Sequence, residues 1–401
     1  MKVIEGSITA PRGFLAQGVC AELKKKDKKD VAIIYSQKKC QAAAVYTTNK
    51  VRASCIDLNQ AHLCNGEAQA IVVNSGNANA CTGEKGRADT MYMAKLTADL
   101  LDISMEDVLV ASTGVIGVYM PMDKVERGIR EAAASLSVDG ASNVAQAIMT
   151  TDLISKEIAV EIEIQDKKVH IGAIAKGSGM IHPNMATMLS FITTDAAISS
   201  KCLQTMLKAS ADLSYNMISV DRDTSTNDIA IILANGEAGN PVIDDIDSPD
   251  YKLFKEALDY VNISLAKKIA RDGEGATRMI EVQVINAPDE HTARVIARSV
   301  TSSNLTKAAV FGEDANWGRI LAAAGYSGAD FDPDRVDVYL GTEKMAENGM
   351  GLLFDEEKAR TELKRDTVKI IIDLKSGDCQ ATAWGCDLSY EYVRINAAYR
   401  T

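Results

Sequence analysis

The sequence predicts a mixed α/β fold. Short apolar runs that are typical of buried strands alternate along the chain with amphipathic stretches of helical period. The composition fits a globular protein, with 46% hydrophobic residues, 25% charged residues and 7 prolines. A chain of 401 residues can bury a large core, and its length allows about two or three domains.

The first half of the chain predicts two strands followed by two helices. The runs "DVAIIYS" and "QAIVVNS" are expected to form buried strands. The stretches "ADTMYMAKLTADLL" and "MDKVERGIREAAASL" each place apolar residues on one helical face. These residues are Met93, Leu96, Thr97, Leu100 and Leu101 in the first, and Val125, Ile129, Ala132 and Leu136 in the second. Both helices are interpreted as packing elements.

The stretch "KEIAVEIEIQDKKVHIGAIAKG" predicts a β-hairpin. Residues 165–168 form a polar turn between two runs in which apolar residues alternate. The alternating residues are Ile158, Val160, Ile162 and Ile164, then Val169, Ile171 and Ala173. Further along, "SSKCLQTMLKASADLSY" predicts a helix, and "VDVYLG", "TVKIIIDL" and "CQATAWGCDLS" predict strands.

Charge and cysteine usage exclude several classes of protein. The net charge is −11, which disfavours nucleic acid and acidic membrane surfaces as partners. The 8 cysteines form no CxxC pair and the 4 histidines lack HExxH spacing, so no metal site is predicted. Free thiols without a secretion signal predict a cytoplasmic protein. The uncharged stretch 177–194 approaches the length of a membrane span, but polar residues recur through it.

The most informative stretch is "KGSGMIHPNMATML", residues 176–189, which follows the predicted hairpin. A glycine-rich turn before the next element is one interpretation. A phosphate-binding loop is disfavoured, because GxxxxGK[ST] places its lysine after the glycines and Lys176 precedes them. The third interpretation is self-cleavage between Ala186 and Thr187.

Self-cleavage would solve a chemical problem. A threonine hydroxyl is a poor nucleophile at neutral pH and needs a neighbouring base, yet no Ser-His-Asp arrangement is visible. Breaking the bond before Thr187 frees an α-amine beside its own hydroxyl. That amine titrates near ~7.7–8.0, against ~10.4 for a lysine, so it is partly neutral at cytosolic pH. Lys176 would then remain a cation for a substrate or an oxyanion.

This stretch resembles the self-cleavage motif of the ornithine acetyltransferase family, the glutamate N-acetyltransferases of the arginine pathway. Every fixed position of the family motif is met. Further blocks are similar and follow the family order along essentially the whole chain: "TAPRGFLAQG", "VYTTNKV", "VNSGNANACTG", "ASTGVIG", "IMTTD", "DRDTSTND", "DGEGATR", "ANWGRILAAAGYSG" and "YVRINAAYRT".

The resemblance implies a role for each matching residue. Thr187 matches the nucleophile, and Thr113 and Gly114 in "ASTGVIG" match the pair that stabilises the oxyanion. The implied substrate contacts are Thr150, Lys176, Thr187, Glu274, Asn396 and Thr401. Without the resemblance these residues have ordinary interpretations: a glycine-rich turn near a helix start for Thr113 and Gly114, solvated surface charges for Lys176 and Glu274, a local bond for Thr150 and a frayed end for Thr401.

The resemblance also implies the fold, the reaction and the assembly. The fold is an α/β sandwich of mixed sheets flanked by helices, formed jointly by fragments 1–186 and 187–401, which family members assemble as an α2β2 heterotetramer. The reaction moves an acetyl group from N-acetylornithine to glutamate through acetyl-Thr187, without a metal or organic cofactor. Some members also use acetyl-CoA as a donor. Two alternatives stay open: an N-terminal-threonine hydrolase or aminopeptidase with water as acceptor, and a non-catalytic binding protein whose loop stays uncut.

Overall fold

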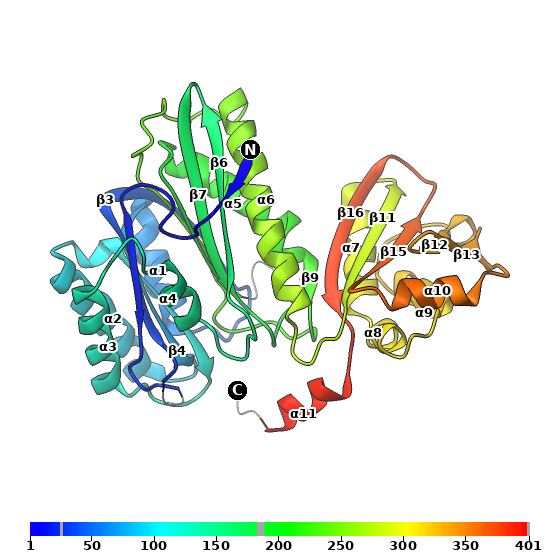
Figure 1. Cartoon of the computed structure of the whole chain (residues 1–401), viewed down its shortest axis with the longest axis horizontal. Coiled ribbons are helices and arrows are strands. Elements are labelled where there is room, and N and C mark those ends of the chain that lie inside the picture. The colour runs from blue at the N-terminus through cyan, green and yellow to red at the C-terminus, as the bar shows by residue number, and fades with distance from the viewer. Residues whose placement is uncertain (25–26, 183–187, 399–401) are drawn as a thin grey trace.

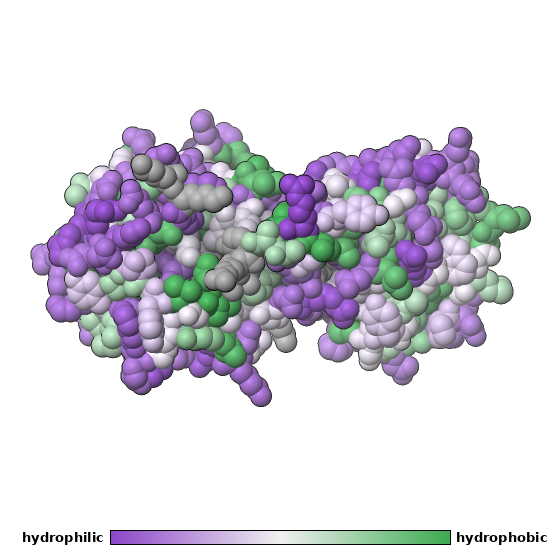
Figure 2. All heavy atoms as spheres, turned by 90° about the horizontal axis from the view of Figure 1, so that it is seen from below, coloured by the Kyte–Doolittle hydropathy of each residue, from purple (hydrophilic) through white to green (hydrophobic). Residues whose placement is uncertain are grey.

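Two mixed β-sheets, one in each of two lobes, organise the chain (Figure 1). The computed structural model describes residues 1–24, 27–182 and 188–398. Helices flank both sheets, so the predicted α/β architecture is confirmed. Figure 2, which views the molecule from below, shows the lobes joined through a narrower waist.

The first sheet carries the order β1-β6-β7-β8-β10-β3-β4-β5, with β2 beside β3. Its strands are β1 (Lys2–Ile4), β2 (Phe14–Val19), β3 (Val31–Tyr46), β4 (Glu67–Asn77), β5 (Val108–Val115), β6 (Lys156–Ile164), β7 (Lys167–Lys176), β8 (Leu189–Thr194) and β10 (Ile229–Ala234). The pairs β8–β10 and β4–β5 are parallel and the other pairs are antiparallel. The predicted hairpin is β6–β7, and both predicted N-terminal strands are present as β3 and β4.

The second sheet lies wholly after residue 217 and carries the order β14-β13-β12-β15-β11-β16-β9. Its strands are β9 (Ile218–Ser219), β11 (Met279–Ala287), β12 (Asp337–Leu340), β13 (Glu343–Glu347), β14 (Met350–Gly351), β15 (Thr367–Asp373) and β16 (Cys379–Cys386). The three strands predicted late in the chain are β12, β15 and β16. The pairs β11–β15 and β9–β16 are parallel.

The helices include each one that the sequence predicts. They are α1 (Ser54–His62), α2 (Gly83–Leu101), α3 (Met122–Ala134), α4 (Ala141–Ala147), α5 (Ser200–Leu213), α6 (Pro249–Arg271), α7 (Glu290–Ser302), α8 (Asn304–Phe311), α9 (Trp317–Gly325), α10 (Glu356–Leu363) and α11 (Tyr390–Ala398). Short 3-10 turns occupy Leu63–Asn65, Met105–Asp107, Tyr215–Met217 and Pro333–Arg335. Within the described ranges no helix has the length and apolar character needed to cross a membrane.

Alternation along β3 explains how both faces of the first sheet are covered. Val31 and Ile33 point into the core formed with α2 and α3, whereas Ala32 and Ile34 point into the core formed with α4. In the second half of β3, Val45 joins a third core, which contains α5 and α6. Successive residues of one strand therefore pack helices on opposite sides of the sheet.

Helix α6 joins the two lobes through that third core. Its start is fixed by Ser248, whose hydroxyl accepts the Tyr251 N–H, and by Pro249 in the first turn. Leu258 and Leu265 of this helix share one buried cluster with residues of β6 and β7 in the first sheet and of β11 in the second. The core is thus continuous from one lobe into the other.

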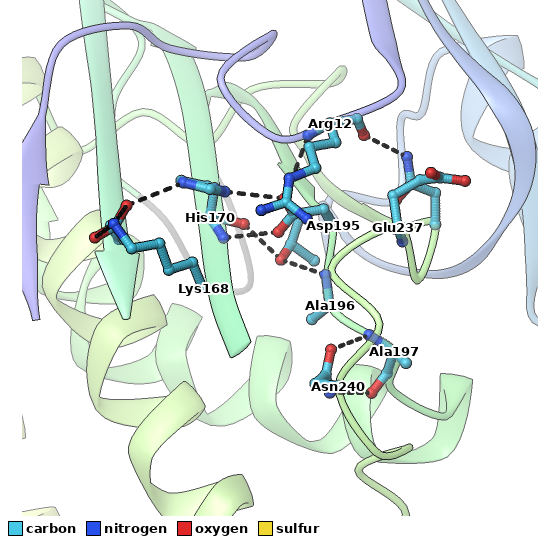
Figure 3. Close-up of polar contacts among 11 residues, drawn as sticks. Arg12, Lys168, His170, Asp195, Ala196, Ala197, Glu237 and Asn240 are labelled. Carbon is cyan, nitrogen blue, oxygen red and sulfur yellow. Dashed lines mark hydrogen bonds and ion pairs between the residues drawn. The ribbon is translucent and has the colours of Figure 1, made fainter. Parts of the chain in front are cut away.

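A buried carboxylate fixes the N-terminal segment to the first sheet (Figure 3). Asp195 accepts the His170 backbone N–H at 2.7 Å, approaches His170 Nδ1 at 2.9 Å and accepts the Arg12 N–H at 3.3 Å. The other ring nitrogen of His170 lies 3.3 Å from Glu161. Because both ring nitrogens have partners, His170 is a structural histidine, about 20 Å along β7 from Lys176.

The shared core predicts the effect of a truncation in α6. Leu265→Ala should lower the free energy of unfolding by about 2–5 kcal/mol, because Leu265 is fully buried and its removal leaves a cavity. Urea unfolding followed by circular dichroism measures this change. Lys252→Ala, on the exposed side of the same helix, is the control and should stay within about 0.5 kcal/mol of the wild type. Equal losses in both variants would contradict a core that continues through α6.

Candidate active site

A cavity of about 190 Å³ brings together the described residues that the sequence assigns to catalysis and substrate binding. It lies where the ends of β5 and β7, the segment after α6 and the helix α11 meet. Six predicted residues line it: Thr113, Gly114, Thr150, Lys176, Glu274 and Asn396. These residues are far apart in the sequence, so their convergence is a property of the fold.

Thr113 and Gly114 lie at the end of β5 and not in a turn at a helix start. Gly114 has φ +133°, and a Cβ built on it would lie 2.3 Å from the carbonyl carbon of Gly76 in β4. A side chain there would push β4 and β5 apart, so this position requires glycine. Both residues line the cavity, where backbone N–H groups and the Thr113 hydroxyl are available to a ligand.

Lys176, the last residue of β7, is buried, with 8% of its surface exposed. It is therefore not a solvated surface charge. Its effect is visible on Asp152: burial alone would raise the pKa of that carboxyl, but Lys176 and Lys156 outweigh burial and lower it to about 2. Lys176 thus supplies a positive charge at the cavity wall.

Glu274 is also buried, and two neighbours orient it. Its backbone N–H donates to the Ser178 carbonyl at 2.9 Å, and Asn396 Nδ2 donates to its Oε2 at 2.8 Å. A Cβ on Gly179 would lie 2.4 Å from the Glu274 carboxyl carbon, so a larger residue would displace the carboxylate from this position. Asn396 comes from α11, which leaves the second sheet after β16 and runs back toward the first lobe (Figure 1).

A buried cluster of charges holds the segments around the cavity. Lys156 is fully buried and lies 2.8 Å from Asp152 Oδ1 and 2.6 Å from Asp272 Oδ2. Asp152 also accepts the backbone N–H groups of Gly177 at 2.7 Å and of Thr150 at 3.0 Å. One ion cluster therefore ties together the segments that carry Thr150, Lys176 and Glu274.

Three predicted residues, Ala186, Thr187 and Thr401, lie outside the described residues. Their roles stay predictions, as does the division into fragments 1–186 and 187–401. The chain on either side of residues 183–187 is fixed. Met180 and Ile181 donate their backbone N–H groups to Asp221 at 2.6 and 2.8 Å, and the Met188 carbonyl accepts the Ile229 N–H at 2.9 Å.

Comparison with known proteins decides the family. The ArgJ family model matches residues 15–401. The chain belongs to the ArgJ family. It is 54% identical over 405 residues to the arginine biosynthesis bifunctional protein ArgJ of Caldanaerobacter subterraneus, and 56% identical over 403 residues to the protein of that name from Symbiobacterium thermophilum, with full coverage of both partners in each case.

A solved structure of an arginine biosynthesis bifunctional protein argJ, from Bacillus halodurans, is similar to part of this ArgJ-family chain. The two are 45% identical with a TM-score of 0.52. The match covers 53% of the present chain and 100% of the solved one. The recognised resemblance and the α/β fold are thereby confirmed.

Acidic residues for which the sequence predicts no catalytic role also line the cavity. Asp221 and Asp223 line it together with Asn227 and Tyr392. Asp228 is fully buried beside this segment, and burial raises its pKa well above the usual range although a hydrogen bond to Ser225 and the charge of Lys176 oppose the shift. A signal for the aspartates was present, because they belong to the quoted block "DRDTSTND". Among the described residues no group of His, Cys, Asp and Glu could hold a metal ion.

The charge cluster predicts a large loss of stability when its cation is removed. Lys156→Met should lower the free energy of unfolding by about 3–5 kcal/mol, because two carboxylates are left close together without their counter-ion. Chemical denaturation measures this loss.

The double variant Lys156→Met/Asp152→Asn is the matched control. It removes one of the stranded charges and should recover part of the loss. Additive losses in the double variant would contradict a coupled cluster.

Proposed function

We propose that this ArgJ-family protein is a glutamate N-acetyltransferase of arginine biosynthesis, which moves an acetyl group from N-acetylornithine to glutamate. The observation that carries the proposal is the convergence of Thr113, Gly114, Lys176 and Glu274 on one cavity beside the strand that begins after Thr187. The names of the relatives place those proteins in arginine biosynthesis and call them bifunctional.

The cavity suits a charged amino acid. Lys176 can pair with a carboxylate of the substrate, and Glu274 can accept hydrogen bonds from an ammonium group. Asn396, which already donates to Glu274, offers its amide oxygen to the same amino acid. N-acetylornithine and glutamate share an α-carboxylate and a side chain ending in a polar group, so one set of contacts can serve both in turn.

The transfer takes place in two steps at Thr187. The hydroxyl gives its proton to the free α-amine of the same residue and attacks the acetyl carbonyl of N-acetylornithine. The oxyanion is stabilised by Thr113 and Gly114, where one missing donor costs about 2.7–4 kcal/mol. The C–N bond breaks, its nitrogen takes the proton, and ornithine leaves. The amine of glutamate then attacks the acetyl ester and gives its proton to the α-amine. The ester C–O bond breaks, the α-amine passes the proton to the Thr187 oxygen, and N-acetylglutamate leaves.

The nucleophile is produced by self-cleavage in this proposal. The Thr187 hydroxyl attacks the Ala186 carbonyl, the peptide bond becomes an ester, and water hydrolyses that ester. The topology supports two fragments that stay together, since β8 pairs with β7 and β10 pairs with β3 across residue 187. An α2β2 assembly in the cytoplasm is part of the proposal.

We also propose a second activity, acetylation of glutamate by acetyl-CoA, because the relatives are named bifunctional proteins. In this scheme acetyl-CoA is a second acyl donor to Thr187, and no resident cofactor is needed. Both activities share the acetyl ester and the glutamate half-reaction.

The nucleophile predicts a paired result for cleavage and activity. Wild-type protein should split in denaturing electrophoresis and transfer acetyl to glutamate faster than to water. Thr187→Ala should give only an uncut band near 43.1 kDa and no detectable transfer, because the attacking hydroxyl is missing.

Thr187→Ser, which keeps a hydroxyl, is the control and should retain partial cleavage. Two fragments from Thr187→Ala would exclude this nucleophile. Release of free acetate from the wild type at the same rate with and without glutamate would favour the hydrolase alternative.

The cation at the cavity wall predicts a defect in substrate use. Lys176→Ala should raise KM for glutamate on the order of 10–100-fold, because a charged hydrogen bond contributes about 1.5–3 kcal/mol. Steady-state kinetics measures the change. Lys168→Ala, an exposed lysine of the same strand β7, is the matched control. An unaltered KM in Lys176→Ala would remove this lysine from the binding set.

A further inference from the structure

A second cavity of about 410 Å³ lies behind the wall of the reaction pocket. The segment 221–224 separates the two spaces. Asp221 and Asp223 line the reaction pocket, whereas Arg222 and Thr224 line the second cavity. The two cavities share no lining residue, so the second is a separate site.

One face of α7 forms the floor of the second cavity. Val295, Arg298, Ser299 and Ser302 line it at the spacing of residues that share a helix face. Tyr326 and Ser327, which follow α9, add two hydroxyl groups. No carboxylate is found among the described residues that line this space. That composition is unusual in a chain with a net charge of −11.

His182 orients the guanidinium of Arg298. Arg298 Nη2 lies 3.3 Å from His182 Nε2, and His182 Nδ1 lies 3.0 Å from Ser219 Oγ. A guanidinium can only donate, so Nε2 accepts and the ring proton is on Nδ1. Burial, with the charges of Arg298 and Arg222, lowers the pKa of His182 to about 4, so the ring is neutral at pH 7.

Arg222 and Arg298 therefore place two positive charges in the lining of the cavity. Each is a planar guanidinium, which donates paired N–H groups to phosphate or carboxylate oxygens. A single group with two negative charges matches the pair, and a phosphate monoester has about −1.5 to −2 at pH 7. A space of about 410 Å³ also has room for the rest of a small molecule beyond its phosphate.

We propose that this cavity is a binding site for a small phosphate-bearing molecule, in which Arg222 and Arg298 hold the phosphate group. The site is distinct from the acetyl-transfer pocket, and the inference does not depend on the reaction proposed above. An occupant would contact the segment 221–224, which also lines the reaction pocket. Hydrogen bonds join this segment to residues 180–182: the Thr224 hydroxyl donates to the His182 carbonyl at 2.9 Å, and Asp221 accepts the backbone N–H groups of Met180 and Ile181.

Calorimetric titration of the full-length protein at low ionic strength tests the site with inorganic phosphate and pyrophosphate as probes. We expect saturable binding of one phosphate probe per chain. Arg222→Gln and Arg298→Gln should each weaken it at least tenfold, and the probe should raise the melting temperature of the wild type but not of these two variants. Arg222 is exposed, so its substitution leaves the fold intact even if the Arg298 variant unfolds.

Arg294→Gln is the matched control. Arg294 lies one turn earlier on α7, pairs with Glu290 and is outside the cavity, so this variant should bind as the wild type does. Absence of binding to the wild type, or unchanged binding in Arg222→Gln, would overturn the proposal. Equal affinity for succinate, a dianion without phosphate, would overturn the assignment of the ligand class.

Discussion

The arrangement of the active site depends on one buried ion cluster, in which Lys156 lies between Asp152 and Asp272. Burying a charge is costly unless it is paired and hydrogen-bonded, so these three side chains must come together whenever the chain folds. Each belongs to a different part of the site. Asp152 follows Thr150, Lys156 begins β6, and Asp272 precedes Glu274. The need to pair these buried charges therefore fixes the relative positions of the three segments.

The hydrogen bonds around the cluster extend that constraint to the ligand-facing groups. Asp152 accepts the Gly177 N–H, which fixes the chain directly after Lys176. The Ser178 hydroxyl donates to the Asp272 carbonyl at 2.7 Å, and the Ser178 carbonyl accepts the Glu274 N–H. The glycines at 177 and 179 let these segments approach closely. The glycines of the loop motif are therefore needed for packing, whatever the chemistry at Thr187.

Local pattern was sufficient to predict some of the elements, among them the hairpin β6–β7 and the helices α2, α3 and α5. Alternation in residues 158–173 identified the hairpin, and helical spacing of Val125, Ile129 and Ala132 identified α3, because both signals depend on neighbours in sequence. Local pattern could not predict which residues meet at the cavity. Thr113 and Asn396 meet only after two sheets have formed, and no local rule brings them together; the family resemblance supplied that grouping. Burial of Lys176 and Glu274 was also invisible locally, since lysine and glutamate are usually exposed.

In the proposed reaction the acetyl group passes through Thr187, a threonine that begins a new chain. Mass spectrometry tests it most directly, on purified enzyme treated with N-acetylornithine in the absence of glutamate and then digested. We expect two polypeptides, with a single added acetyl group on the peptide whose first residue is Thr187, and loss of that group when glutamate is added. Active enzyme that is one uncut chain, or an acetyl group that forms on another residue and passes to glutamate, would contradict it.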